Sequence, residues 1–412
     1  MYKRQKLHKE GFIAYFAGGW VRDFLLSVPS DDIDIVTDAS IQEIQCIFPK
    51  TIPVGINFGI VVVVEKGQKF EVSTFRKDRE YRDGRHPIGI EKASPEEDAR
   101  RRDFTINGMF YDPLTKTLYD FVEGQKDIKR GIIRAIGNPQ ERFLEDRLRM
   151  IRAVRYACRL CFSIENATLT AILDHSSTLF PSVAIERIWN ELSKMANVPN
   201  FDMALVTLHR LNLLSIIFPS LNYIPISEIQ RRVQFIESFP KEAPVITKIL
   251  ELFPFTTLDE KKELCLYLKL SNQMHHFVQF YHRAQSILDI EKKSEREPFE
   301  WAHFYAHSFY PICLKILATH LSSKEKTLFF REHHTRQNRL KEAIQKIQSN
   351  IPFLSSHDLR KVGVPNGKHM GKLLREGERL AINESLKTPA MIINRLKKHP
   401  IWINSKIDNL NN

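Results

Sequence analysis

The sequence predicts an α+β domain at the N-terminal end of the chain, followed by a region built from helices alone. Strand and helix patterns alternate up to about residue 135, and β-branched alternation nearly disappears after Pro139, where helical periodicity takes over. The 412 residues are enough for two to four domains. An apolar content of 43% is ordinary for a globular protein that buries a core.

Each element of the α+β domain has its own local signal. A helix is expected at Gly19–Leu26, because its pattern ends just before Pro29. Short apolar or β-branched runs predict strands at Phe12–Phe16, Asp32–Val36, Gly59–Val64 and Lys69–Phe75.

Beyond Pro139, apolar residues recur at helical spacing. The first helix is expected to be long and to run from Glu141 to Leu160. Further amphipathic helices of a bundle or solenoid are expected at Leu169–Leu173, Ile185–Met195, Met203–Leu214, Glu228–Phe239 and Leu258–Leu268.

The formal net charge of +12 favours a polyanionic partner. Nucleic acid fits better than a membrane, because no apolar run approaches the ~18 residues of a membrane span. The basic N-terminus Met1–Lys6 is not followed by an apolar signal core, so we expect a cytoplasmic protein. Basic residues also gather beyond Lys324, where they either suit an RNA backbone or form a solvated helix face.

A glycine turn stands at the start of the first expected helix. Gly18 and Gly19 let backbone N–H groups approach a phosphate, and Arg22 lies one turn into the helix. The turn is not a Walker A loop, because no Lys-Ser/Thr pair follows it. Alone, it could also be an ordinary turn.

Two carboxylates follow directly. Asp32 and Asp34 are two residues apart, so they share one face of a strand and repel each other unless a cation lies between them. Carboxylate oxygens suit Mg²⁺, and two such ions can activate a hydroxyl and stabilise a leaving pyrophosphate. Glu71 on a neighbouring strand is a candidate third carboxylate, or else an ordinary half-buried glutamate. A phosphate turn beside paired carboxylates indicates nucleotide transfer.

The segment Arg101–Asn107 combines phosphate and sugar partners. Arg102 is a candidate phosphate contact, and Asp103 and Asn107 can hydrogen-bond a ribose 2′-hydroxyl. A helix end with salt bridges would show the same residues.

Charged residues recur at intervals of three on the long expected helix, namely Asp146, Arg149, Arg152 and Arg155. They are expected to form an exposed, mostly basic face. Asp146 and Arg149 place an acceptor beside a donor, which matches the Watson–Crick edges of adenine and cytosine and rejects those of uracil and guanine. A solvent-facing helix with an intrahelical salt bridge would have the same spacing.

These four motifs, in this order, resemble those of the class II tRNA nucleotidyltransferase and bacterial poly(A) polymerase family. GGWVRD with DIDIVT is similar to the family's first motif, and RRDFTIN is similar to its second. Asp120–Ile128 resembles its hinge, Glu145–Arg149 its nucleotide-reading motif, and Glu186–Trp189 the supporting helix. Gly108 and Arg147 depart from the family pattern, which commonly has alanine and proline there.

The resemblance implies a fold and a set of site residues. It implies a polymerase-β-like nucleotidyltransferase head at residues 1–138, a base-recognising neck at 139–200, a helical body at 201–330 and a helical, tRNA-binding tail at 331–412. It implies Mg²⁺ on Asp32 and Asp34, with Glu71 as a further catalytic carboxylate. It also implies nucleotide contacts from Gly18, Gly19, Arg22, Arg102, Asp103, Asn107, Asp146, Arg149, Arg152 and Arg155, with Asp103 and Asn107 at the ribose.

Three segments make the CCA-adding branch the closer resemblance. Pro53–Ile60 lacks the Gly-Arg-Arg-Phe-like segment of poly(A) polymerases, Tyr81–Pro87 resembles a loop used in switching from C to A, and Val362–Lys368 resembles a tail loop. We therefore expect CCA addition to the 3′ end of tRNA from CTP and ATP. A poly(A) polymerase, an A-adding tRNA nucleotidyltransferase and an inactive RNA-binding relative stay open, as does the oligomeric state.

Overall fold

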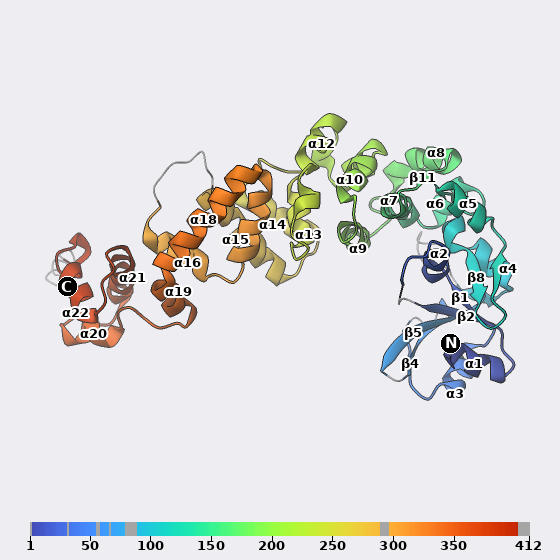
Figure 1. The fold of residues 1–412 in the computed structure, drawn as a ribbon, viewed down its shortest axis with the longest axis horizontal. Helices are drawn as coiled ribbons and strands as arrows, with labels where there is room; N and C mark the ends of the chain where they lie inside the picture. The colour runs from blue at the N-terminus through green and yellow to red at the C-terminus, as the bar shows by residue number, and fades with distance from the viewer. Residues whose placement is uncertain are drawn as a thin grey trace. The chain divides into compact units, whose positions relative to one another are not determined.

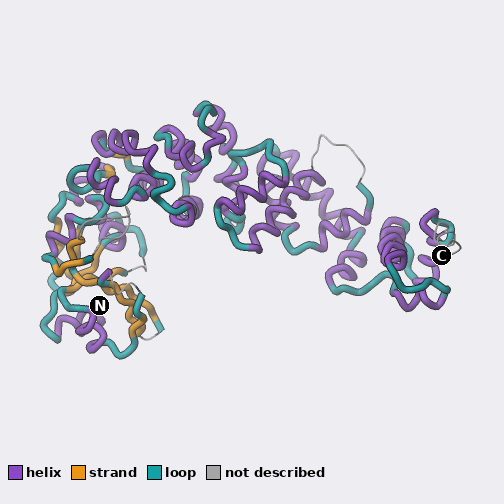
Figure 2. Tube along the Cα trace, turned by 180° about the vertical axis from the view of Figure 1, so that it is seen from behind, coloured by secondary structure: helices purple, strands orange, loops and turns teal. Residues whose placement is uncertain are grey.

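The computed structural model describes residues 2–30, 33–54, 58–65, 67–78, 89–288 and 296–402. The chain forms two compact units, Met1–Glu237 and Ser238–Asn412. Strands lie in the first unit, and the described part of the second consists of helices and loops (Figures 1 and 2). The expected α+β region followed by a helical region is confirmed. The finer division at residues 138, 200 and 330 stays a prediction.

A seven-stranded sheet forms the centre of the first unit, in the order β3-β4-β5-β2-β1-β8-β9. β2 and β5 pair in parallel, and the other neighbours pair antiparallel. The strands are β1 Ala14–Ala17, β2 Asp34–Thr37, β3 Thr51–Ile52, β4 Ile60–Glu65, β5 Gln68–Thr74, β8 Met109–Asp112 and β9 Thr117–Asp120. The first unit also contains two short separate pairs: β6 Arg76–Asp78 with β7 Ile90–Lys92, and β10 Ile132–Ile133 with β11 Ser163–Ile164. The four expected strands are confirmed, with slightly shifted ends.

Helices flank this sheet and then continue beyond it within the first unit. They are α1 Tyr2–Lys9, α2 Gly19–Leu25, α3 Ile41–Ile47, α4 Pro95–Arg100, α5 Gly124–Arg130, α6 Pro139–Glu145, α7 Leu148–Leu160, α8 Asn166–His175, α9 Ile185–Ala196, α10 Phe201–Arg210, α11 Leu213–Ile217 and α12 Ile226–Val233. Short 3₁₀ turns lie at Thr105–Asn107, Ser176–Thr178, Pro219–Leu221 and Ile236–Ser238.

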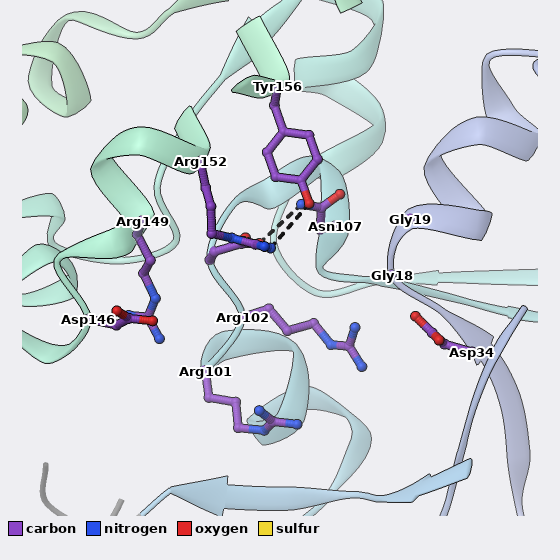
Figure 3. Close-up of a pocket in the computed structure, with 11 residues that line it drawn as sticks. Gly18, Gly19, Asp34, Arg101, Arg102, Asn107, Asp146, Arg149, Arg152 and Tyr156 are labelled. Atoms are coloured by element: carbon purple, nitrogen blue, oxygen red, sulfur yellow. Dashed lines mark hydrogen bonds and ion pairs between the residues drawn. The ribbon is translucent and has the colours of Figure 1, made fainter. Parts of the chain in front are cut away.

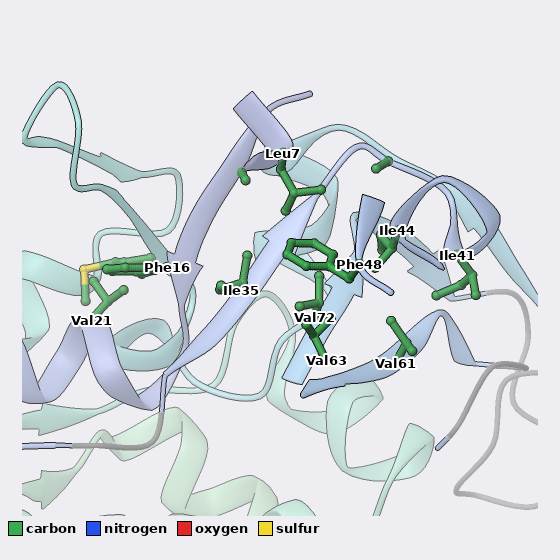
Figure 4. Packing of buried hydrophobic residues seen from close by; sticks show 13 residues of the cluster. Leu7, Phe16, Val21, Ile35, Ile41, Ile44, Phe48, Val61, Val63 and Val72 are labelled. Carbon is green, nitrogen blue, oxygen red and sulfur yellow. The ribbon is translucent and has the colours of Figure 1, made fainter. Parts of the chain in front are cut away.

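The side chains of β2 alternate between two cores, one on each face of the sheet. Ile35 belongs to a cluster that includes side chains from α1, α2 and α3 (Figure 4). Val36 belongs to a second cluster, with Phe75 and Phe110. Asp34 lies two residues before Val36, so it shares the face of this second cluster. Strand alternation therefore directs the Asp34 carboxylate away from the core of α1–α3.

The single helix expected at Glu141–Leu160 is wrong. The structure has two helices, α6 and α7, with a break at Asp146 and Arg147. Asp146 has extended backbone, with φ −145° and ψ 103°, and its Oδ1 accepts a hydrogen bond from the Leu148 backbone N–H at 3.1 Å. A short acidic side chain that bonds nearby backbone competes with helical hydrogen bonding, which accounts for the break.

The second unit is a succession of helices whose apolar faces pack together. Leu373, Leu380 and Leu396 are among the side chains of one buried cluster near the C-terminal end. The helices are α13 Val245–Leu250, α14 Leu258–Tyr267, α15 Asn272–Leu288, α16 Pro298–Ala306, α17 Tyr310–Leu317, α18 Ser323–Arg339, α19 Lys341–Gln348, α20 Ser356–Lys361, α21 Lys368–Asn383 and α22 Pro389–Leu396, with a 3₁₀ turn at Ala318–His320. Across both units, none of the described helices is both long and apolar enough to span a membrane.

Candidate active site

A pocket of about 330 Å³ lies in the first unit, between the β1–α2 turn, β2 and α7 (Figure 3). Most of the predicted site residues meet there, although they come from distant parts of the chain. The lining residues are Gly18, Gly19, Asp34, Arg101, Arg102, Asp103, Asn107, Asp146, Arg149, Arg152 and Tyr156.

The turn between β1 and α2 lines the pocket with the backbone of two glycines, which carry no side chain. Gly18 has φ +65° and ψ −133°, a conformation that residues with a Cβ rarely adopt. A Cβ on Gly18 would lie 3.3 Å from Arg102 Nη1 and 3.5 Å from Asp34 Oδ2. Backbone N–H groups, a cation and a carboxylate therefore share one end of the pocket. Such a combination can hold the phosphates of a nucleotide together with a metal ion.

The parallel pairing of β2 with β5 places two acidic residues side by side. Asp34 is paired in register with Glu71, and residues paired in this way share a face of the sheet. Asp34 lines the pocket, whereas Glu71 does not. Asp32 lies outside the described residues, and within the described ones no group of three metal-ligating side chains occurs. The hard oxygen ligands of Asp34 and Glu71 suit a divalent cation.

One buried carboxylate of α4 holds the two arginines that directly follow this helix. Asp98 is fully buried, its Oδ1 accepts from Arg101 Nη2 at 2.7 Å, and its Oδ2 accepts from Arg102 Nη2 at 3.0 Å. Burial alone would raise the pKa of Asp98, but the charges of the two arginines outweigh it and lower that pKa. The salt-bridged helix end is thus present, and it presents both guanidinium groups to the pocket.

Asp103 is the centre of a buried hydrogen-bond network. Its Oδ2 accepts from Arg152 Nε at 2.9 Å and from Nη2 at 2.5 Å. Its Oδ1 accepts from the Phe104 backbone N–H at 2.8 Å and from Asn107 Nδ2 at 3.1 Å. Burial would raise the pKa of Asp103, but the Arg152 charge and these hydrogen bonds hold it well below its usual range. Asp103 is therefore an ionised group whose oxygens already take four N–H donors.

Arg22 and Arg155 are not among the residues that line the pocket. Arg22 is 1% exposed, and its Nη2 donates to Asp23 Oδ1 at 2.7 Å. Arg155 is 8% exposed, and its Nε donates to Glu191 Oε2 at 2.6 Å. The expected exposed basic stripe on α7 is therefore wrong, because α9 covers this part of α7 and supplies a buried counter-charge. Contacts from Arg22 and Arg155 to a nucleotide stay predictions.

Asp146 and Arg149 line the same end of the pocket (Figure 3), but they do not belong to one helix. Asp146 Oδ2 accepts from Arg187 Nη2 at 3.0 Å, a contact to α9. Arg149 Nη1 donates to Glu145 Oε2 at 2.7 Å and to the Arg142 carbonyl at 3.0 Å. The acceptor and the donor are thus each anchored by partners of their own.

Arg101 and Tyr156 line the pocket but were not among the predicted site residues. Tyr156 follows Arg152 by four residues on α7, so the helical spacing of neighbours on one face could have identified it. Arg101 could have been identified as the neighbour of Arg102 at a helix end. Two of the segments that resemble the CCA-adding branch, Tyr81–Pro87 and the middle of Pro53–Ile60, lie outside the described residues.

The departure at Gly108 has a local cause. A Cβ at this position would lie 2.7 Å from Val122 Cγ2 and 3.0 Å from Ile136 Cδ1. The packing of this chain therefore leaves too little room for an alanine.

Two family profiles match separate parts of the first unit. The profile described as "Poly A polymerase head domain" matches residues 14–134. The profile described as "Probable RNA and SrmB-binding site of polymerase A" matches residues 161–224. Between them lies α7 with its buried arginines.

Curated proteins are similar over part of the chain. A CCA-adding enzyme of Staphylococcus saprophyticus is 45% identical over 194 residues, which cover 47% of this chain and 48% of that protein. A CCA-adding enzyme of Ligilactobacillus salivarius is 47% identical over 192 residues, which cover 46% and 47%. The chain therefore spans about half the length of the curated relatives it matches.

A solved structure is similar over nearly the whole chain. It is the crystal structure of the Bacillus stearothermophilus CCA-adding enzyme in complex with CTP, with a TM-score of 0.77 and 27% identity. The similarity covers 96% of both chains, so it extends into the second unit, beyond the range of the two profiles.

Proposed function

We propose that this chain, which belongs to the class II tRNA nucleotidyltransferase and bacterial poly(A) polymerase family, adds C, C and A to the 3′ end of tRNA without a nucleic-acid template. The pocket carries the proposal, because a glycine turn, a carboxylate and a base-reading couple line one cavity. The similarity to a CCA-adding enzyme in complex with CTP supports CTP as a substrate. ATP is the second proposed substrate.

The glycine turn binds the triphosphate in this proposal. The backbone N–H groups of Gly18 and Gly19 and the Arg102 guanidinium carry positive charge at the Asp34 end of the pocket. Asp98 keeps Arg102 in place, so little side-chain freedom is lost when phosphate binds. The tRNA 3′-hydroxyl then attacks the α-phosphate, and pyrophosphate leaves toward this cationic end.

Membership of this family carries a general requirement for a divalent metal ion. We propose that the ion is Mg²⁺, held by Asp34 and Asp32, with Glu71 close by on β5. When bound, such an ion lowers the pKa of the attacking hydroxyl and offsets the charge of the leaving pyrophosphate. Asp34 suits this role because it lies at the end of the pocket where the proposal places the phosphates.

Asp146 and Arg149 choose the base. The Asp146 carboxylate accepts from the amino group of cytosine or adenine, and Arg149 donates to the neighbouring ring nitrogen. Uracil and guanine present the opposite order, which would leave buried groups unpaired at a cost on the order of 1–3 kcal/mol each. Arg187 and Glu145 keep the two side chains in position between additions.

The basic chain and the profile match at residues 161–224 support tRNA as the partner. We propose that the protein works in the cytoplasm, since the relatives come from bacteria, which make their tRNA there.

A single assay tests this function against its alternatives. One purified tRNA lacking its terminal CCA is incubated with labelled ATP alone, with CTP alone, and with both. Two additions with CTP and three with both nucleotides are the expected results. A long ladder with ATP alone would instead indicate a poly(A) polymerase. A second tRNA that already ends in CC is incubated in the same way, and addition of one A to it with no addition to the first tRNA would indicate an A-adding enzyme. RNA binding without any incorporation would indicate an inactive relative.

A further inference from the structure

Tyr156 lines the wall of the pocket, and its hydroxyl lies beside Arg152. Figure 3 draws Tyr156 near Arg152 and Asn107, between Gly18 at one end and Asp146 at the other. The sugar of a nucleotide joins its phosphates to its base. Under the proposed function, this central part of the pocket therefore faces the ribose.

The hydroxyl of Tyr156 is available as a hydrogen-bond donor. Arg152 Nη2 donates to the Tyr156 oxygen at 3.2 Å, so the oxygen serves as the acceptor in that contact. A phenol also carries one O–H donor. Within the described part of the chain, no acceptor has a hydrogen bond from this proton. Because Arg152 occupies one side of the oxygen, the proton points away from Arg152.

Three guanidinium groups surround the Tyr156 ring. The central carbon of Arg155 lies 4.2 Å from the ring centroid, that of Arg22 lies 5.1 Å away, and that of Arg152 lies 5.5 Å away. Cation–π contacts of this kind fix the ring. The ring is thus held rigidly with its hydroxyl toward the pocket.

Asp103, the predicted ribose acceptor, is already engaged. Its two oxygens take hydrogen bonds from Arg152, Asn107 and the Phe104 backbone. A sugar hydroxyl that approached Asp103 would compete with these donors. The Tyr156 hydroxyl offers a contact that breaks none of them.

We propose that the Tyr156 hydroxyl donates a hydrogen bond to the 2′-oxygen of the bound nucleotide, and that it helps to select ribonucleotides over deoxyribonucleotides. This inference rests on the proposed function, because it places a nucleotide in the pocket. It assigns Tyr156 a direct contact with the sugar.

The test compares two ligands on two proteins. Dissociation constants of CTP and 2′-deoxy-CTP are measured by titration calorimetry for the full chain and for its Tyr156→Phe variant. The variant removes one oxygen and fills the same space. Loss of one neutral hydrogen bond is expected to weaken CTP binding about three- to tenfold and to leave 2′-deoxy-CTP binding unchanged. The preference for CTP therefore shrinks by that factor.

Two results would overturn the inference. Equal weakening of both nucleotides would mean that Tyr156 acts only by holding Arg152, and unchanged affinities for both would mean that the hydroxyl makes no nucleotide contact. Because the inference is judged from the ratio of two affinities on one protein sample, a modest loss of stability does not affect it. Tyr119→Phe is the matched control, since Tyr119 stacks on Tyr15 at 4.8 Å and does not line the pocket.

The assay also separates this inference from the proposed function. A protein that shows the 2′-preference and loses it in Tyr156→Phe, but adds nothing to tRNA, would retain the inference and reject CCA addition. A protein that adds CCA with an unaltered preference in the variant would do the reverse.

Discussion

Two helices of this chain are rich in arginine and use it in opposite ways. On α7, in the first unit, Arg149 and Arg155 are each 8% exposed and donate to Glu145 and Glu191. On α18, in the second unit, Arg331 is exposed, and His333 is the buried residue of the helix. Charge spacing along the two helices does not distinguish them. The difference comes from whether another helix supplies a carboxylate to the buried face.

The largest expected effect belongs to Asp34, a half-buried carboxylate of the pocket in the first unit. Asp34→Asn removes the negative charge at the phosphate end of the pocket and keeps the shape of the side chain. We expect nucleotide incorporation into tRNA to fall by more than about a thousandfold, because the proposed metal ligand is lost, with little change in stability. Asp259→Asn is the control, since this aspartate is exposed in the second unit and bonded only to Lys262 in the same helix. Activity of Asp34→Asn within tenfold of the parent would reject the proposed role.

A second variant pair compares the two helices directly. Arg155→Met leaves Glu191 buried without its 2.6 Å partner, so we expect the free energy of unfolding of the first unit to fall by about 3 kcal/mol. Arg331→Met makes the same chemical change on the exposed face of α18 and is expected to change stability by less than about 0.5 kcal/mol. Urea titration followed by circular dichroism measures both. Similar effects in the two variants would remove the distinction between the helices.

Base choice is expected to depend on two anchored side chains of the first unit. Asp146→Ala combined with Arg149→Ala removes the acceptor and the donor, so the preference for CTP and ATP over UTP and GTP should fall about a hundredfold. The measurement is kcat/KM for each nucleotide on tRNA lacking CCA. Single-nucleotide kinetics of the Arg331→Met variant give the control. An unchanged preference in the double variant would refute the pairing scheme.

The smallest expected effect is a pH dependence in the second unit. Burial lowers the pKa of His333 from 6.5 to about 4, with Arg336 acting in the same direction, and the Tyr305 hydroxyl lies 2.7 Å from His333 Nδ1. The unfolded chain then binds a proton at higher pH than the folded one. Stability from this group is therefore complete above about pH 6.5 and declines as the pH falls toward 4, by about 2 kcal/mol at pH 5.

Urea titrations at pH 8 and pH 5 would measure this loss. The His333→Asn variant should have a smaller difference between the two pH values, because asparagine does not titrate. An equal difference in the variant would show that other groups cause the pH dependence.

Local patterns were sufficient to predict the strands, the glycine turn and the order of the motifs. The hydrophobic alternation in β2 fixes which side chains share a face, and the expected proximity of Glu71 to Asp34 agrees with the register of β2 and β5. These features depend on residues a few positions apart, or on strands that are adjacent in the sheet. The order of an α+β region and then a helical region also follows from the change of periodicity near Pro139, whereas the boundary between the two compact units lies later, after Glu237.

Features that depend on distant residues were missed. The burial of Arg155 requires Glu191, which is 36 residues away and on another helix. The break at Asp146 was missed for a local reason, because its side chain bonds the Leu148 backbone N–H and charge spacing does not encode that contact. The orientation of Tyr156 depends on arginines from both α2 and α7. Rules based on residue spacing assume that the helix is continuous and that one of its faces is exposed to solvent. Neither assumption holds at this site.

The pairing of Asp34 with Glu71 makes strand alignment a condition for chemistry as well as for folding. Deleting a single residue inside β2 would shift its register by one residue, so that an aliphatic side chain in place of Asp34 lies opposite Glu71. The sheet could still form. Natural and engineered length changes should therefore be tolerated between β3 and β4 but not within β2 or β5. We therefore expect such a deletion to abolish nucleotide incorporation even where the domain still folds.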